Sequence, residues 1–280
     1  MAQNDFKPFA IGSGANVTSQ ADWEALSALA TGFQSGKASS AQVNKALRQG
    51  TFAASALAQF ITVQTNSDVL DSGDINAFVA LLENALGVFA TGRLLNVKTY
   101  TASGTYSKSA GTKHIRVRVW GAGGGGANTA TAGQASGGGC GGGYAEGYYD
   151  VSDLSTATIT VGSGGANVPA LTLGSGGNGG TSSFGTLISA TGGTGSISTS
   201  AGGKGTGGNL INFTANAAQG SLTTGVAGSG GASYASSTAA PHISVPGDDG
   251  SFPGGGGAGG NGSQASGKGA SGFIIIEEYS

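Results

Sequence analysis

Cysteine and charged residues are scarce in this chain of 280 residues. Its single cysteine, Cys140, excludes an intramolecular disulfide framework and a cysteine zinc cluster, and it fits assembly in a reducing cytoplasm. Asp, Glu, Lys and Arg make up 9% of the residues and leave a formal net charge of −2. Because phosphate backbones and anionic lipids attract basic surfaces, this composition argues against nucleic acid and membrane surfaces as partners.

Long apolar runs are also missing, which excludes a transmembrane helix and predicts no membrane insertion. The opening MAQNDFKPFAIGSG lacks the basic start and continuous apolar stretch of a secretory signal. We therefore expect a soluble chain that reaches the outside of a cell by lysis rather than by export. With 5 prolines and no sustained Gly-X-Y period, the chain cannot form a collagen triple helix.

Groups of residues that could carry catalysis are missing as well. His114 and His242 are too few for a histidine metal site. The adjacent carboxylates Asp248–Asp249 and Glu277–Glu278 point to opposite sides of an extended chain, so neither pair can form an acid/base couple. A Gly-x-Gly-x-x-Gly match at residues 174–179 has no helix after it and is expected by chance among so many glycines. The sequence therefore predicts no enzyme activity, no metal and no cofactor.

Glycine is abundant but unevenly distributed. Of the 57 glycines, 8 lie in residues 1–95 and 49 lie in residues 96–280. This shift in composition predicts a boundary near residue 95, between a first module (1–95) and a glycine-rich domain (96–280).

The first module has the apolar spacing of helices. Capping patterns, with Gly50 and Gly87 as stops, predict four short helices over about 19–31, 39–50, 52–61 and 71–87. Four short helices make a thin core for a module of this size. We therefore predict a module that assembles with partner chains, and a self-contained helical bundle is the alternative.

The glycine-rich domain alternates apolar segments with glycine tracts. Lys113–Trp120 (KHIRVRVW) alternates strictly, which predicts a half-buried strand with Ile115, Val117 and Val119 on one face. Further strands are predicted over residues 144–151, 156–161, 171–173, 186–190 and 273–279. A β-sandwich is the economical packing for such strands.

The glycine tracts allow two interpretations. Such tracts usually form flexible linkers, but they can also form extended helices of three residues per turn that pack side by side. We favour the packed helices because the chain returns to an apolar strand after nearly every tract. The last strand, Phe273–Tyr279, must also pair with strands far back in the sequence. The predicted fold class is thus α+β multidomain: a small helical N-terminal module, then a glycine-rich β-sandwich with packed polyglycine type II helices.

The helical module resembles a known family. Within residues 4–87, the segments NDFKPFAIGSGANVTSQADWEAL, TGFQSGKASSAQVNKALRQ and DVLDSGDINAFVALLENAL resemble the N-terminal module of phage and prophage tail-fibre proteins. In that family the module lies at the virion-proximal end, upstream of varied receptor-binding domains. The resemblance implies that residues 1–95 attach to virion tail proteins. Together with the thin core, it predicts a homo-oligomer, specifically a trimer.

The second domain carries a resemblance of its own. YTASGTYSKSAGTKHIRVRVWGAGGGG, GGGYAEGYYDVSDLSTATITVGSGG and GKGASGFIIIEEY resemble the glycine-rich C-terminal domain of phage tail fibres. A β-sandwich with packed polyglycine helices also occurs in T-even-type fibre-tip adhesins and in the glycine-rich region of anaplastic lymphoma kinase receptors. The resemblance is weakest over residues 193–252. It implies a tail-fibre receptor-binding protein (adhesin) that is made in the host cytoplasm and located in the virion.

Receptor contact is predicted in the loops, because specificity usually resides on loops displayed by a rigid scaffold. The first choice is the stretch 231–252, and the second is 209–226. The candidate contact residues are Tyr234, His242, Asp248, Asp249, Phe252, Asn209 and Phe213. The expected receptor is an outer-membrane protein, a pilus or a glycan. Alternatively, Tyr234 and Phe252 only pack the domain, and the chain is a structural fibre or adaptor component that binds no receptor directly.

Overall fold

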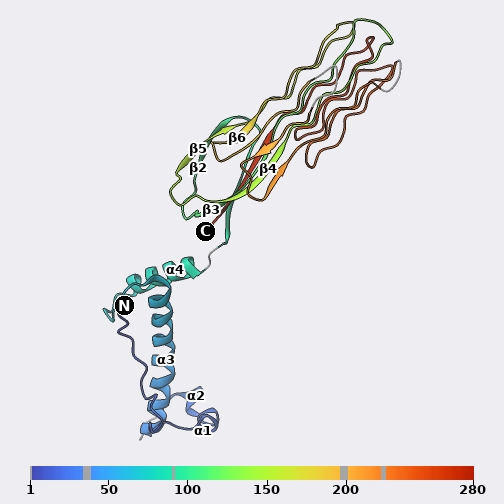
Figure 1. Cartoon of the computed structure of the whole chain (residues 1–280). Helices are drawn as coiled ribbons and strands as arrows, with labels where there is room; N and C mark the ends of the chain where they lie inside the picture. The colour runs from blue at the N-terminus through green and yellow to red at the C-terminus, as the bar shows by residue number, and fades with distance from the viewer. Residues whose placement is uncertain (1, 34–38, 90–91, 196–200, 222–224) are drawn as a thin grey trace. The chain divides into compact units, whose positions relative to one another are not determined.

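The structure is a computed structural model, and it describes residues 2–33, 39–89, 92–195, 201–221 and 225–280 (Figure 1). The chain divides into two compact units, Met1–Thr91 and Gly92–Ser280. The first unit is helical, and the second consists of two open β-sheets and a set of extended segments. No helix in the described part of the chain is both long enough and apolar enough to span a membrane.

The described residues of the first unit form four helices: α1 (Gln20–Glu24), α2 (Ala28–Thr31), α3 (Ser40–Thr65) and α4 (Ile75–Phe89). The side chain of Ser19 accepts a hydrogen bond from the backbone N–H of Asp22, which confirms the predicted start of the first helix. The prediction of one helix over 19–31 was wrong, since α1 ends at Glu24 and α2 begins after Ser27. At the break the backbone forms the tighter i→i−3 hydrogen bonds, from Leu26 to Trp23 and from Leu29 to Leu26 (both 3.1 Å), which interrupt the α-helical pattern.

Gly50 does not end a helix, so the second and third predicted helices are one helix, α3. Glycine inside a helix costs only about 1 kcal/mol of stability relative to alanine, so a single glycine does not end the helix. Helix α3 ends instead before Asn66, whose backbone adopts the left-handed conformation (φ 52°) that is common at helix C-termini. Helix α4 starts later than predicted. Its N-terminal cap is Asp74, whose carboxylate accepts hydrogen bonds from the backbone N–H groups of Asn76 (3.0 Å) and Ala77 (3.1 Å). It continues past Gly87 to Phe89.

The core of the helical unit is small. Ala58 and Ile61 of α3 pack against Val69 and against Ala85 of α4, with Phe6, Phe60, Phe78, Leu81 and Leu82 around them. The N-terminal segment is held to this core by backbone hydrogen bonds between Val69 and residues 3 and 5 (2.8 and 3.0 Å). Outside this core, the buried apolar side chain among the unit's described residues is that of Trp23 in α1.

Within the described ranges of the second unit, ten strands form two sheets. Their bounds are β1 (Leu94–Tyr100), β2 (Gly104–Ser107), β3 (His114–Trp120), β4 (Tyr144–Asp150), β5 (Thr156–Thr160), β6 (Ser182–Phe184), β7 (Ile188–Ala190), β8 (Gly205–Thr206), β9 (Ile211–Phe213) and β10 (Phe273–Tyr279). The strand orders are β1-β10-β3-β4-β9 and β2-β5-β6-β7-β8, with antiparallel neighbours. Strand β10 lies between β1 and β3, which confirms that the last strand pairs far back in the sequence.

One hydrophobic core joins the two sheets. The strict alternation of β3 is confirmed, because Ile115, Val117 and Val119 are fully buried. They pack with Ile274 and Ile276 of β10 and, from the second sheet, with Tyr106, Ile159, Phe184 and Ile188. The predicted strand at 171–173 was wrong. Leu171 has φ 53° and lies in a turn, and this left-handed conformation is incompatible with the extended backbone of a strand.

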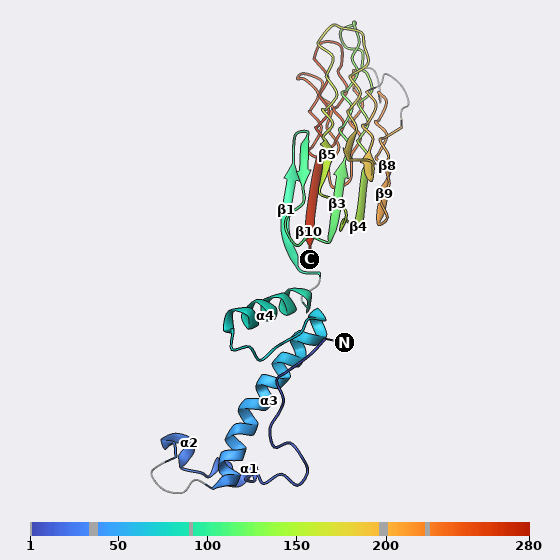
Figure 2. The same ribbon diagram turned by 90° about the vertical axis from the view of Figure 1, so that its left-hand side faces the viewer.

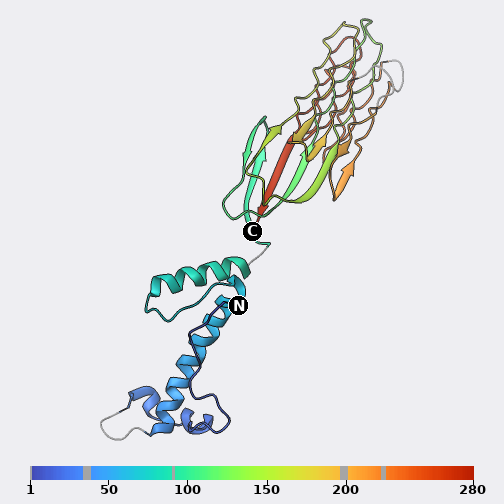
Figure 3. The same cartoon turned by 60° about the vertical axis from the view of Figure 1, so that its left-hand side comes forward.

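The glycine tracts run side by side, away from the sheets, and turn back at the far end (Figures 1, 2 and 3). Hydrogen bonds from residues 121–128 repeat every three residues. Each set of every third residue donates its backbone N–H groups to one neighbouring segment. The first set bonds to residues 137–143 (Gly121 to Gly143, Gly124 to Cys140, Ala127 to Gly137). The second set bonds to residues 174–180 (Ala122 to Gly180, Gly125 to Gly177, Asn128 to Gly174), and the third bonds to residues 267–270 (Gly123 to Ala270, Gly126 to Gly267). The tracts are therefore bonded to one another as a bundle, which argues against the linker interpretation.

Close backbone approach explains why this bundle requires glycine. Residues 121–128 are buried. A Cβ atom on Gly123 would overlap the carbonyl oxygen of Gly255, and one on Gly126 would overlap that of Ala258. A Cβ atom on Gly220 would meet nothing within 4 Å. The absence of side chains lets the segments touch at the centre of the bundle, whereas its periphery is open.

Candidate functional site

An aromatic row crosses the outer face of the first sheet. Phe273, Trp120, Tyr144 and Phe213 are cross-strand neighbours on β10, β3, β4 and β9. Ring centroids of Trp120 lie 5.8 Å from Phe273 and 4.7 Å from Tyr144. The row stands where β3 and β4 join the glycine bundle, because the tracts at 121 and 143 begin directly beside it.

Two loops cover this row with the predicted contact residues Tyr234 and Phe252. The Tyr234 ring stacks on Tyr144 at 4.1 Å and lies 5.8 Å from Phe213, while its carbonyl accepts the indole N–H of Trp120 at 2.8 Å. The Phe252 ring lies 5.2 Å from Phe273. Tyr234 is 39% exposed and Phe252 is 52% exposed. Both residues therefore pack against the domain and also present part of a ring to solvent.

Charged side chains lie next to the aromatic row on the same face. Arg116 Nε donates to Glu146 at 2.7 Å, Arg118 pairs with Glu277, and the Tyr144 hydroxyl donates to Glu146. Burial raises the pKa of Glu146, but the hydrogen bonds from Tyr144 and Arg116 outweigh it and lower the pKa overall. Glu146 and Glu277 are thus each paired with an arginine of β3, and these pairs join neighbouring strands on this face of the sheet. Among the described residues, no group of three or more His, Cys, Asp or Glu could hold a metal ion.

The remaining predicted contact residues lie elsewhere. His242 and Asp248 form an exposed pair at 2.9 Å that closes a turn. The Asp249 carboxylate accepts the backbone N–H of Lys268 at 2.6 Å. Asn209 binds the backbone of Tyr148 through both side-chain atoms (2.7 and 2.8 Å). The structure thus brings Tyr234, Phe213 and Phe252 to the aromatic row, but it does not join all seven residues in one site.

A second surface lies at the far end of the bundle, where the segments turn (Figure 2). We call residues 129–134, 169–173, 243–246 and 262–265 the distal turns. Asn128 is fully buried and directly precedes the first of these turns, where its side chain accepts the N–H of Thr129 (2.9 Å). It ties this turn to two others, because its side-chain amide donates to the carbonyls of Pro169 (2.8 Å) and Gln264 (2.9 Å) and accepts the N–H of Gly262 (2.9 Å). The Asn261 side chain donates to the carbonyl of Ile243 and so holds the fourth turn.

These distal turns expose large apolar side chains and contain no charged residue. Leu171 is 61% exposed, Leu173 68%, Ile243 64% and Val245 52%. Exposed apolar groups gathered on a rigid support are typical of interaction surfaces. Sequence reasoning missed Leu171 and Leu173 because it placed them in a strand. It included Ile243 and Val245 only within the loop 231–252. The available signal was the occurrence of these residues beside Pro169, Pro241 and Pro246 in a chain that has little proline.

Comparison with known proteins agrees with the division of the chain. Residues 98–279, more than half of the chain, match a family described as a glycine-rich domain. No curated protein matches the sequence. The matched range runs from β1 to the end of β10 and includes both sheets and the whole glycine bundle. The chain therefore belongs to the glycine-rich domain family.

Proposed function

We propose that this protein is a phage tail-fibre receptor-binding protein. Residues 1–95 attach it to virion tail proteins, and the distal turns contact the bacterial surface. The observation that carries the proposal is the group of exposed, uncharged apolar side chains at the distal turns, led by Leu171, Leu173 and Ile243. The backbone of their turns is held by hydrogen bonds from the side chains of Asn128 and Asn261, so little loop entropy is lost when a receptor binds.

We also propose that the bundle consists of polyglycine II helices beside a β-sandwich. The three-residue period of the donated hydrogen bonds supports this, since polyglycine II has three residues per turn. Residues 121–128 donate to three neighbouring segments and accept from three others, through the amides of Gly165, Gly193 and Gly257. Six neighbours are what hexagonal packing of such helices requires. Amides of residues 121–128 should then exchange with solvent as slowly as those of β3, and rapid exchange would restore the linker interpretation.

The aromatic row is the second contact surface under this proposal. Tyr234 and Phe252 keep exposed ring edges, and aromatic rings bury much area at a low cost in entropy. The receptor classes that suit such surfaces are an outer-membrane protein, a pilus or a glycan. The proposed assembly is a homotrimer in the virion, made in the host cytoplasm.

Adsorption of the purified full chain tests the function. Labelled protein should bind cells of a susceptible strain and compete with virions that carry the chain. The double variant Leu171→Ser, Ile243→Ser should lose at least about tenfold in adsorption, because it removes exposed apolar contacts without touching a core. Its melting temperature should stay the same. Leu187→Ser removes an apolar side chain that is 42% exposed between β6 and β7, and as the matched control it should leave adsorption unchanged.

Loss of adsorption in the control, or normal adsorption of the double variant, would place the contact elsewhere. A structural adaptor is the second candidate function, favoured by the same uncharged turns, which could equally seat another virion protein. A wild-type chain that is incorporated into virions but adsorbs to no strain in a broad panel would support that function instead.

A further inference from the structure

The helical unit leaves much of its apolar surface uncovered. Helix α3 has 26 residues, of which only Lys45, Ala58 and Ile61 are buried. Phe52, Leu57 and Val63 of α3 are exposed, as are Ile75, Val79 and Leu86 of α4. Apolar side chains on several faces of a helix favour burial against a partner, because the described part of the helical unit leaves them uncovered.

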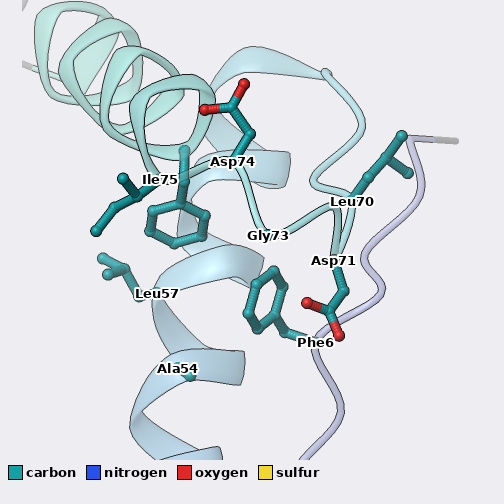
Figure 4. Close-up of a pocket in the computed structure, with 9 residues that line it drawn as sticks. Phe6, Ala54, Leu57, Leu70, Asp71, Gly73, Asp74 and Ile75 are labelled. Atoms are coloured by element: carbon teal, nitrogen blue, oxygen red, sulfur yellow. The ribbon is translucent and has the colours of Figure 1, made fainter.

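An acidic cleft lies on this uncovered surface (Figure 4). It has a volume of about 320 Å³ between α3, the start of α4 and the loop that joins them. Phe6, Leu57, Leu70, Ile75 and Phe78 form its walls, and Asp71 and Asp74 lie on its rim. The Asp74 carboxylate caps α4. Asp71 is exposed, and among the described residues its carboxylate forms no ion pair.

A basic surface lies nearer the start of α3. Ile11 and Phe52 supply its apolar part, at 60% and 61% exposure, and Lys45 and Arg48 line it. Lys45 is buried, and its ammonium group donates a hydrogen bond to the side chain of Gln20 at 2.8 Å, so it already has a partner within the chain. Arg48 is partly exposed and forms no ion pair among the described residues. The apolar ring of Phe52 and the guanidinium of Arg48 are therefore complementary to a cleft that has apolar walls and an acidic rim.

These two surfaces cannot meet within one chain. Arg48 and Leu57 are nine residues apart on the same helix. At 3.6 residues per turn they face opposite sides and lie about 14 Å apart along the axis. Different, complementary surfaces on opposite faces make a head-to-tail contact, whereas a two-fold dimer would pair one surface with itself.

We propose that the acidic cleft of one copy receives Phe52 and Arg48 of the next copy, with Arg48 pairing with Asp71 across the interface. Each copy then offers one cleft and fills another, so the contact continues until the ring closes. The ring of three rests on the homotrimer of the proposed function, but the contact itself rests only on the helical unit.

Charge reversal in the full chain tests this contact. Light scattering and sedimentation at micromolar concentration should give an oligomer for the wild type. Arg48→Glu and Asp71→Arg should each weaken assembly by at least about tenfold, because each places like charges together in a partly desolvated interface. The double variant should recover the wild-type mass. Glu83→Arg, an exposed reversal on α4, is the matched control and should assemble normally.

Circular dichroism should report the same helix content for all four variants, so that a loss of mass is not a loss of fold. A monomeric wild type, single variants of wild-type mass, or a double variant that stays dissociated would each overturn the proposal. None of these results affects adsorption through the distal turns, which are tested separately. Failure of the contact and failure of the receptor-binding function can therefore be told apart.

Discussion

The glycine-rich unit has two regions whose cores are made of different groups. Between the sheets, the core consists of large apolar side chains such as Phe184, Ile274 and Ile276. In the glycine bundle, the central segments 121–128 and 254–262 are equally buried, yet they consist almost entirely of backbone. The sheets gain stability from apolar area removed from water. The bundle depends instead on backbone hydrogen bonds in three directions, which offset the conformational entropy that glycine loses.

This difference predicts opposite responses to substitution. A side-chain core loses stability when atoms are removed, because a cavity remains. A backbone core loses stability when atoms are added, because the segments must move apart and break many hydrogen bonds together. Turns at the end of the bundle escape both constraints, since their side chains face solvent. A scaffold of this kind can therefore carry varied turns without changing its interior.

Adding one methyl group to the bundle should have the largest effect. Gly123→Ala places a Cβ atom on the carbonyl oxygen of Gly255. We expect a loss of more than about 4 kcal/mol in the unfolding free energy of the glycine-rich unit, or no folding at all. Gly220→Ala has open space around it and should change stability by less than about 1 kcal/mol. Calorimetry of both variants checks this, and equal melting temperatures would contradict the backbone core.

Removing atoms from the sheet core should have a smaller but clear effect. Ile276 is fully buried between the sheets. Ile276→Ala should cost about 2–5 kcal/mol, and Ile276→Val should cost about 0.5–1.5 kcal/mol, because the cavity grows with each carbon removed. Chemical denaturation of the two variants measures the difference. A graded loss here, beside an abrupt loss at Gly123, would sharpen the contrast between the two regions.

Acid should weaken the sheet region through Glu278. Burial raises the pKa of this carboxyl, but hydrogen bonds from Ser109, Tyr106 and Lys98 outweigh it and lower the pKa to about 2. Because the pKa is lower in the folded state than in the unfolded state, the ionised carboxylate stabilises the fold at pH values above about 4.5. This stabilisation is lost as the pH falls from about 4.5 toward 2. The contribution is on the order of 3 kcal/mol. Unfolding free energies between pH 6 and 2.5 should therefore fall less steeply in Glu278→Gln than in the wild type. Parallel slopes would contradict this assignment.

The smallest effect is expected at the edge of the bundle. His242 and Asp248 form an exposed pair, and such pairs contribute about 0–1 kcal/mol. His242→Ala should therefore leave the unfolding free energy of the glycine-rich unit nearly unchanged in thermal denaturation. A loss of more than about 2 kcal/mol would mean that this turn is part of the core rather than a peripheral attachment.

The sequence by itself determined the elements whose signal is local. Alternation in Lys113–Trp120 predicted β3 and its buried face, and the position of the final apolar segment predicted its distant pairing. The capping signal at Ser19 predicted a helix start. Where a local signal was weak, prediction was wrong. Gly50 was predicted to end a helix although a helix tolerates a single glycine, and 171–173 was predicted to be a strand although Leu171 lies in a turn.

Tertiary structure alone decided the candidate site. Tyr234 could be read as a contact or as a packing residue, and only its stacking on Tyr144 shows that it packs while keeping an exposed edge. The distal turns come together because the buried side chain of Asn128 reaches turns that are about 40 and 136 residues away along the chain. No local pattern encodes such hydrogen bonds. Which glycines are central and which are peripheral depends on how the segments pack, since every glycine is chemically the same in the sequence.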